Sequence, residues 1–174
     1  MIAGPTLKKT ITQEGVSLDD LSKEKTVLLV FLRHFGCVFC REAMKDLSKK
    51  RPELERRGVE IVFVHMSDNK TAQEYFTKYN LKGVKSIPDP SCKLYADFGL
   101  VKGSASQLFG LKNWARGFEV VAKDPSILSL KQIGDGFQMP GVFLIQNGKI
   151  MESFIHKSAA DRPDYLALVD CCAA

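Results

Sequence analysis

With 174 residues the chain is long enough for one domain with a substantial core, and its composition, 45% hydrophobic and 26% charged, is typical of a globular protein. It contains no apolar run near the ~18 residues of a membrane helix, and its first ten residues lack the apolar core of a signal peptide. The net charge of +5 is modest, and the basic residues of 49–57 are interleaved with glutamates, which argues against a nucleic-acid interface. We therefore expect a cytoplasmic protein that folds as a single domain over residues 1–174, with no nucleic acid and no membrane among its partners.

The first strong structural signal follows a short lead-in. Residues 1–25 are expected to form a hairpin or extended piece, in which Ser17 begins a capped turn of helix. Six consecutive apolar residues then follow at Val27–Leu32. A run of this length is too short for a helix and is typical of a strand buried on both faces of a sheet.

After this strand the apolar spacing becomes helical. It predicts a helix from near Cys37 to about Arg57. Pro52 interrupts the pattern, so we expect a kink or a restart there, and Gly58 is the expected end of the helix.

Cys37 and Cys40 form a Cys-x-x-Cys pair at the point where the strand gives way to the helix. The first backbone N–H groups of a helix lack intrahelical partners and carry partial positive charge, so they stabilise a thiolate and lower its pKa. Two intervening residues bring the second sulfur round one helical turn, close enough to form a disulfide. A strand before and a helix after is the context in which this spacing indicates redox chemistry.

Two other interpretations of the pair remain open from the residues alone. The pair could be half of a zinc site, although the remaining cysteines, Cys92 and the adjacent Cys171 and Cys172, supply no second Cys-x-x-Cys. The thiols could also be inert, because free cysteine packs like a small hydrophobic residue. Five cysteines in a reducing compartment do not make a disulfide framework, which favours a catalytic or sensing pair. We predict no metal and no cofactor, and a packing role for Cys92 in preference to a resolving one.

A second strand and its helix follow the first pair of elements. Glu60–Met66 has the composition of a core strand, and Thr71–Tyr79 has helical spacing. The strand–helix–strand–helix order predicts parallel pairing through right-handed crossovers. His65, on the strand, is expected to be a buried structural histidine in preference to a catalytic one.

The chain between residues 87 and 99 is shaped by two prolines. Ile87–Pro90 must be extended, because each proline restricts the residue before it. Ser91 or Asp89 can then cap a short helix over Cys92–Phe98.

Residues 101–138 are interpreted as an insertion. Leu111–Lys123 carries apolar residues at helical spacing and predicts one helix, whereas 125–136 resembles a loop. We expect the segment to lie against one side of the sheet, where it could cover the cysteine pair.

The last part of the chain predicts a hairpin and a closing helix. Val142–Ile145 and Ile150–Ile155 read as strands, joined by the hairpin signal Asn147–Gly148. Asp161 can cap a final helix with three inward residues, Tyr165, Leu166 and Val169. Together the elements predict an α/β fold with a central mixed sheet of about four or five strands and helices on both faces.

This order of elements resembles the thioredoxin fold: a buried strand, Cys-x-x-Cys at a helix start, a second strand, then a strand led by proline, an Asn-Gly hairpin and a closing helix. Pro140 matches the proline that is cis in that family and touches the active-site sulfurs. The resemblance therefore implies a cis Met139–Pro140 bond close to Cys37 or Cys40, with both residues supporting the substrate and the proline keeping metals off the dithiol.

Two stretches are more similar to the peroxiredoxin-like group of the alkyl hydroperoxide reductase and thiol-specific antioxidant superfamily, which also carries Cys-x-x-Cys. In V-F-L-R-H-F-G-C-V-F-C-R-E, Cys40 stands at the peroxidatic position and Cys37 where that family has Thr or Ser. Asp89–Leu100 resembles its D-P…G segment. The chain departs from the pattern where Arg33 replaces a proline and Pro140 stands about where a second arginine would be.

These observations give three hypotheses. The first is a thiol–disulfide oxidoreductase in which Cys37 attacks and Cys40 resolves. The second is an antioxidant thiol peroxidase in which Cys40 forms a sulfenic acid, Cys37 condenses with it, and Arg33 or Arg41 polarises the peroxide. The third is a non-enzymatic redox-sensing or interaction module. The expected partners are a protein disulfide or a small peroxide, and a reducing thiol system.

Overall fold

The computed structural model describes residues 4–127 and 135–171, and one mixed five-stranded sheet lies at its centre, in the order β3-β2-β1-β4-β5. The strands are β1 (Thr26–Phe31), β2 (Val59–His65), β3 (Lys85–Pro88), β4 (Gly141–Gln146) and β5 (Lys149–Ile155). β1 pairs in parallel with β2 and antiparallel with β4, which places the strand before the cysteines in the middle of the sheet. The predicted mixed α/β architecture is confirmed, and β3, expected only as an extended piece, adds the edge strand.

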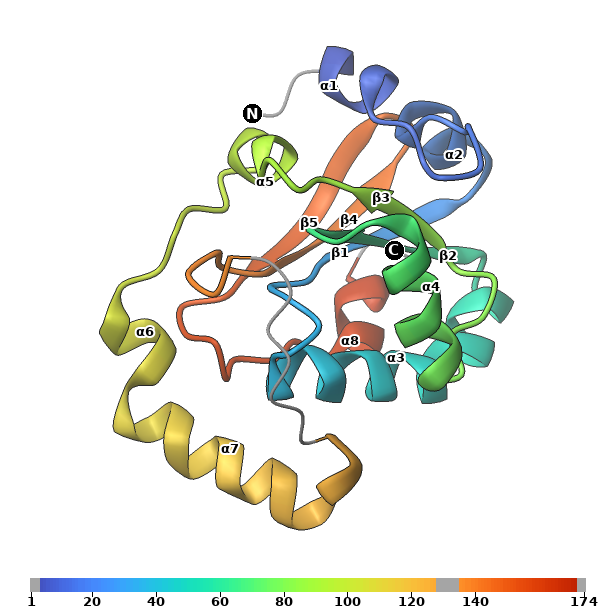
Figure 1. Cartoon of the computed structure of the whole chain (residues 1–174). Helices are drawn as coiled ribbons and strands as arrows, with labels where there is room; N and C mark the ends of the chain where they lie inside the picture. Colours follow the sequence, from blue (N-terminus) through green and yellow to red (C-terminus); the bar gives the residue numbers. More distant parts are fainter. Residues whose placement is uncertain (1–3, 128–134, 172–174) are drawn as a thin grey trace.

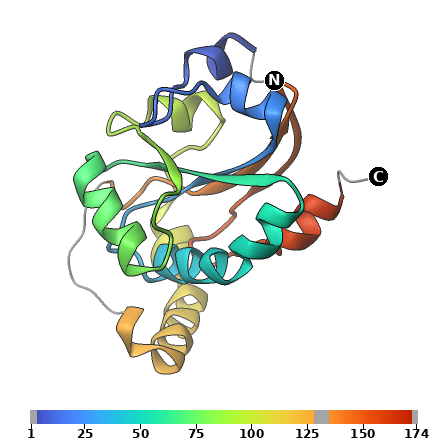
Figure 2. The same cartoon turned by 90° about the vertical axis from the view of Figure 1, so that its right-hand side faces the viewer.

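Helices cover both faces of this sheet, as Figures 1 and 2 show. The helices are α1 (Gly4–Lys9), α2 (Leu18–Glu24), α3 (Val38–Arg56), α4 (Asn69–Lys78), α5 (Lys93–Asp97), α6 (Ala105–Phe109), α7 (Leu111–Lys123) and α8 (Tyr165–Asp170), with a 3-10 turn at Pro125–Ile127. Alternate residues of β1 point to opposite faces. Leu28 and Val30 pack in one core with α3, α4 and α8, and Leu29 and Phe31 pack in the other with α1, α2 and α5.

Several helix boundaries differ from the sequence prediction. α3 continues through Pro52 as a single helix, so no restart occurs there. α4 begins at Asn69 because the Asp68 carboxylate accepts a hydrogen bond from the Thr71 N–H. α8 begins at Tyr165 with Asp164 as its cap, whereas Asp161 caps a separate turn before it. α1 and α6 were not predicted.

The predicted hairpin is present between β4 and β5. Asn147 and Gly148 have φ values of +50° and +71°, the left-handed region that a two-residue hairpin turn requires. The Asn147 N–H donates to the Ser22 carbonyl at 2.7 Å, which ties the turn to α2.

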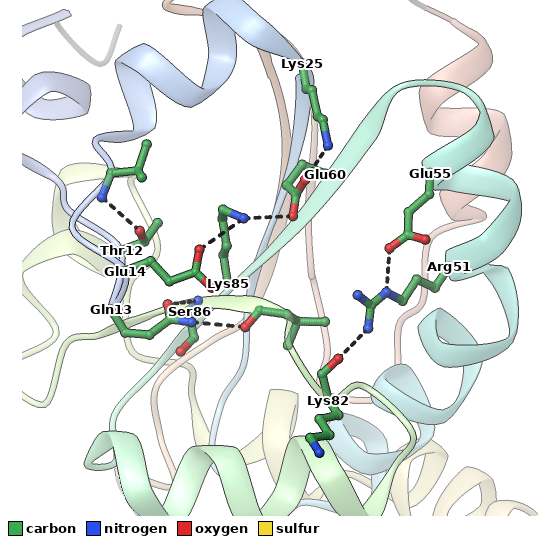
Figure 3. A network of polar contacts seen from close by, with 12 residues as sticks. Thr12, Gln13, Glu14, Lys25, Arg51, Glu55, Glu60, Lys82, Lys85 and Ser86 are labelled. Carbon is green, nitrogen blue, oxygen red and sulfur yellow. Dashed lines mark hydrogen bonds and ion pairs between the residues drawn. The ribbon is translucent and has the colours of Figure 1, made fainter.

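The edge strand β3 is covered by the segment between α1 and α2, through the polar network of Figure 3. The Gln13 N–H donates to the Ser86 carbonyl at 2.8 Å, and the Lys85 ammonium lies 3.2 Å from Glu14 and 3.4 Å from Glu60. An edge strand otherwise offers unpaired backbone groups to other chains, so these contacts protect the sheet.

The 101–138 segment leaves the body of the fold between α5 and β4. Its two ends pair with each other, with the Gly103 N–H donating to the Phe137 carbonyl at 2.8 Å. The predicted helix occurs at Leu111–Lys123 as α7. We expected the segment to lie against the sheet, but α7 packs on α3. Among the described residues no helix is both long and apolar enough to cross a bilayer.

Candidate active site

The two cysteines lie between the end of the central strand β1 and the first turn of α3. Cys37 is the residue immediately before the helix, and Cys40 lies within its first turn. Both are free thiols, and they are similarly buried, with Cys37 7% and Cys40 5% exposed. Their exposed fractions therefore hardly distinguish them, and the difference between the two sulfurs comes from what surrounds each one.

The pKa values of the two thiols are moved in opposite directions. The hydrogen bond from the Cys40 thiol holds the pKa of Cys37 below its usual range, with further help from the Arg33 cation and from the N–H groups of Cys40 and Phe39 at the start of α3. That same interaction with Cys37, together with burial, raises the pKa of Cys40. The arrangement gives one thiolate, on Cys37, beside one protonated thiol.

Arg33 contacts both sulfurs. Its backbone N–H donates to Cys40 Sγ at 3.3 Å, and its guanidinium Nη1 donates to Cys37 Sγ at 3.4 Å. The other guanidinium nitrogen, Nη2, donates to the Gly136 carbonyl at the end of the 101–138 segment. Arg33 is itself buried, so this cation acts on the sulfurs in a region of low dielectric.

Arg41, unlike Arg33, does not lie beside the sulfurs. Its side chain is fully buried, and its Nε and Nη1 donate to the carbonyls of Phe35 and Ile127 at 2.6 and 2.7 Å. Tyr75 lies under the guanidinium, 5.6 Å from its ring centroid to the Arg41 carbon. Arg41 thus holds the loop before the cysteines against the 3-10 turn that follows α7. Among the described residues, no contact joins Arg41 to either sulfur.

Cys37 opens onto a cavity of about 480 Å³ between the start of α3 and α7. Its walls are largely apolar and include Phe39, Trp114 and Phe118. His34 also lines it, and burial lowers the pKa of this histidine to about 4, so the imidazole is neutral at pH 7. A cavity of this size falls within the ~300–1,000 Å³ of small-molecule sites.

Cys40 faces a second cavity on the other side of the pair, of only about 30 Å³. It is enclosed by β1, β4, α3 and α8, and its lining includes Pro140, His156 and Tyr165. The volume has room for about one water molecule. Nδ1 of His156 is buried without a hydrogen-bond partner among the described residues, and burial lowers the pKa of that imidazole to about 4.

Pro140 is close to Cys40 through this small cavity, but the Met139–Pro140 bond is trans, so the predicted cis bond is wrong. The Met139 N–H donates to the Val101 carbonyl at 3.2 Å, and Gln138 forms a β-bridge with Lys102, so the residues before Pro140 are tied to the start of the 101–138 segment. This pairing is made with the trans bond, which a proline favours by about 0.5–1 kcal/mol. Met139 is buried against Leu108 of α6 and Phe39.

The other candidates lie apart from the pair. Cys92 donates to Met66 Sδ at 3.3 Å and adopts a left-handed φ of +56° before α5. His65 is buried in β2 beside the Phe35 ring. Cys171 is exposed at the end of α8, and Cys172 falls outside the described residues. Within residues 4–127 and 135–171, no group of three or more His, Cys, Asp or Glu side chains is arranged to hold a metal.

Comparison with known proteins gives the decisive finding about ancestry. The family model of the AhpC/TSA family matches residues 4–153. The chain belongs to the AhpC/TSA family. Members of this family are thiol-dependent oxidoreductases, so the chain is an enzyme of that kind.

Individual relatives are more distant. The chain is 29% identical over 160 residues to a prostamide/prostaglandin F synthase of Danio rerio, covering 90% of this chain and 79% of that protein. Its fold is similar to that of a peroxiredoxin Q of Xanthomonas campestris, with a TM-score of 0.70 at 15% identity over 100% of this chain and 97% of the other. It is also similar to a protein of Chlorobium tepidum described as a thiol:disulfide interchange protein, with a TM-score of 0.59 at 18% identity over 95% and 92% of the two chains.

Sequence reasoning missed several residues of this candidate site. His34 stands in the stretch that carries the family resemblance and could have been found there. Gly136, His156 and the cavity position of Trp114 depend on contacts between distant parts of the chain, for which the local sequence holds no signal.

Proposed function

We propose that this chain is a thiol–disulfide oxidoreductase in which Cys37 attacks and Cys40 resolves. One observation supports it above the others: Cys37, the thiol with the lowered pKa, opens onto the large cavity, whereas Cys40 is enclosed and protonated. A nucleophile needs both a thiolate and access to the substrate. Arg33, through its contacts with both sulfurs, stabilises the thiolate and positions the pair.

The reaction would run in two exchange steps. The Cys37 thiolate attacks one sulfur of a substrate disulfide, the substrate S–S bond breaks, and the other substrate sulfur leaves as a thiolate. Cys40 then loses its proton and attacks Cys37 Sγ, which closes the Cys37–Cys40 disulfide and releases the second substrate thiolate. Two electrons pass from the protein to the substrate, and a reducing thiol system, such as that of the cytoplasm, must restore the dithiol.

The walls of the cavity favour an apolar substrate. Phe39, Trp114 and Phe118 offer hydrophobic and aromatic surface beside the attacking sulfur. The relatives named as synthases of prostamide or prostaglandin F, which are lipids, agree with that chemistry. We therefore propose a lipophilic molecule or an apolar stretch of a protein as the substrate.

A second candidate is a thiol peroxidase, favoured by membership of the AhpC/TSA family and by the Arg33 N–H on Cys40 Sγ. The Cys40 thiolate would attack one oxygen of a peroxide, the O–O bond would break, and Cys40 would become a sulfenic acid while the other oxygen leaves as an alcohol, or as water from hydrogen peroxide. Cys37 would then attack that sulfenic acid and release water as the disulfide forms.

Single-cysteine variants distinguish the two reactions. The reduced protein is mixed with a model disulfide or with hydrogen peroxide, turnover is followed with an external thiol reductant, and the products are analysed by mass spectrometry. For the oxidoreductase we expect Cys37→Ser to lose disulfide exchange and Cys40→Ser to accumulate a mixed disulfide on Cys37. For the peroxidase the pattern is inverted, with a sulfenic acid accumulating on Cys40 of Cys37→Ser. If neither variant forms an adduct, both proposals fail.

A further inference from the structure

Exposed apolar side chains gather on the 101–138 segment. Of the eight large hydrophobic side chains that are exposed among the described residues, five belong to it. Three of them lie on α7, where Leu111 is 90%, Trp114 59% and Phe118 69% exposed. We call these three residues the α7 apolar face. Contiguous exposed apolar surface on a water-soluble fold marks a surface that meets another apolar phase or molecule.

Helical spacing explains why these residues form one face. Positions 111, 114 and 118 are separated by three and four residues and therefore project from the same side of the helix. Val120 and Asn113 are the buried residues of α7, on the side that packs on the body of the protein. Leu111 contributes almost nothing to that packing, so core formation does not account for an apolar residue there.

The charges of α7 complete the pattern of a helix that lies at a membrane surface. Its basic residues are Lys112, Arg116 and Lys123, and its only acidic residue is Glu119. Arg116 is held by Glu42 of α3 at 2.8 Å, on the side of α7 that packs on the body, and Lys123 lies 2.5 Å from Glu119. Lys112 has no acidic partner among the described residues. Tryptophan, phenylalanine and leucine on one face of a helix whose polar side carries basic residues is the composition of interfacial helices that bind anionic lipid.

The place of α7 in the fold suits such contact. Figures 1 and 2 show α7 at the periphery, beyond α3 and away from the sheet. Trp114 and Phe118 also line the cavity that contains Cys37. A surface that meets the α7 apolar face would therefore lie beside the opening that leads to the attacking sulfur.

We propose that α7 docks the protein on an anionic lipid bilayer, with Leu111, Trp114 and Phe118 entering the headgroup boundary and the Lys112 ammonium reaching lipid phosphates and carboxylates. The helix lies along the surface and does not span it. This proposal replaces the sequence-based expectation that no membrane is a partner. It does not depend on which thiol reaction the enzyme performs.

The single tryptophan of the chain makes the proposal directly measurable, because Trp114 lies on the docking face itself. The full chain is mixed with phosphatidylcholine vesicles that contain or lack phosphatidylserine. We expect the Trp114 emission to shift to shorter wavelength and the protein to sediment with the vesicles that contain phosphatidylserine. Because the attraction is partly electrostatic, added salt should weaken the binding.

The decisive variant is Leu111→Glu, since Leu111 is highly exposed and does not line the cavity. We expect it to reduce vesicle partitioning by about tenfold or more while leaving turnover of a small soluble disulfide unchanged. Met151→Glu on β5, an exposed apolar position away from α7, is the control and should bind vesicles as the parent does. The proposal is overturned if the parent gives neither the emission shift nor sedimentation, if both variants lose binding equally, or if the shift instead tracks self-association without vesicles.

Discussion

The two sides of the cysteine pair differ in almost every physical respect. On the Cys37 side lies an open, largely apolar cavity of about 480 Å³, whose far wall is α7. On the Cys40 side lies a narrow space of about 30 Å³ between strands of the central sheet, α3, α8 and the loop of residues 156–162. One sulfur thus faces a wall built by the 101–138 segment, and the other faces the core.

In the proposed exchange reaction, this difference between the two sides meets two separate requirements. A resolving thiol must stay protonated and protected until its partner has reacted, and the rigid core provides that protection. An attacking thiol must admit substrates, and a segment outside the sheet can vary in shape without disturbing the core. Substrate choice in this protein is therefore expected to depend on α7, and resolution on the sheet.

Matched valines on the two sides give the largest expected contrast. Val142 lines the narrow cavity and is fully buried in β4, whereas Val121 lines the open cavity on α7 and is only half-buried. Val142→Ala should lower the free energy of unfolding by about 2–3 kcal/mol, because the core cannot collapse around the lost methyl groups. Val121→Ala should cost less than about 0.5 kcal/mol. Urea unfolding measures both, and equal losses would contradict the division between core and cavity wall.

The division between the sheet core and the cavity wall also explains which elements could be predicted from the sequence. β1, β2 and β4 were predictable because they contain runs of buried apolar residues, and the cysteine pair because its spacing falls between a strand and a helix. β5 has no buried run and was predictable from the Asn147–Gly148 hairpin signal before it. β3 escaped prediction as a strand because an edge strand of four residues with lysine, serine and proline carries no such run.

The environment of the site was harder to predict than its residues. Helical spacing correctly located the residues of α7. The spacing also predicts which side chains share a face, but not which part of the protein that face contacts. Trp114 and Phe118 were therefore not assigned to the cavity. Arg41 was expected, as an alternative to Arg33, to polarise a peroxide beside Cys40, but its side chain is fully buried. Its partner Ile127 is 86 residues away, and no local pattern encodes such a contact.

Arg33 contacts the sulfurs of both Cys37 and Cys40. Its removal should have the next largest effect, on the reactivity of Cys37. Arg33→Met keeps an apolar side chain of similar length but removes the cation that lowers the pKa of Cys37. The pKa of Cys37 should therefore rise, so less thiolate is present at pH 7 and alkylation of Cys37 by iodoacetamide should slow by about tenfold. The pH profile of alkylation should move to higher pH.

The matched control for Arg33 is Arg33→Lys, which retains a cation but has no planar fork to join Cys37 and Gly136. It should give a pH profile between those of the parent and of Arg33→Met. An unchanged profile in Arg33→Met would mean that the hydrogen bonds of the α3 start alone hold the thiolate.

Weakening the attachment of α7 to the body of the protein should have a smaller effect on stability. The Glu42 carboxylate of α3 forms ion pairs with the guanidinium groups of Arg116 on α7 and of Arg162, each at an N–O distance of 2.8 Å. The Glu42 side chain is only 18% exposed. Glu42→Gln should cost about 1 kcal/mol and speed amide hydrogen exchange within α7 more than within the sheet. Glu119→Gln removes an exposed pair within α7 and should cost less than about 0.5 kcal/mol. Equal exchange in both variants would show that apolar contacts alone hold α7.

The smallest effect is expected at the chain end, which belongs to neither side. Cys171 is exposed at the end of α8, and adjacent cysteines seldom bridge each other because the ring would be strained. The double change Cys171→Ser and Cys172→Ser should therefore alter turnover by less than about twofold, since a substitution at the exposed Cys171 disturbs little. Steady-state turnover with the same disulfide and reductant measures it. A large loss would mean that the tail serves as a resolving arm, and the enclosed Cys40 would then not be the thiol that releases the substrate.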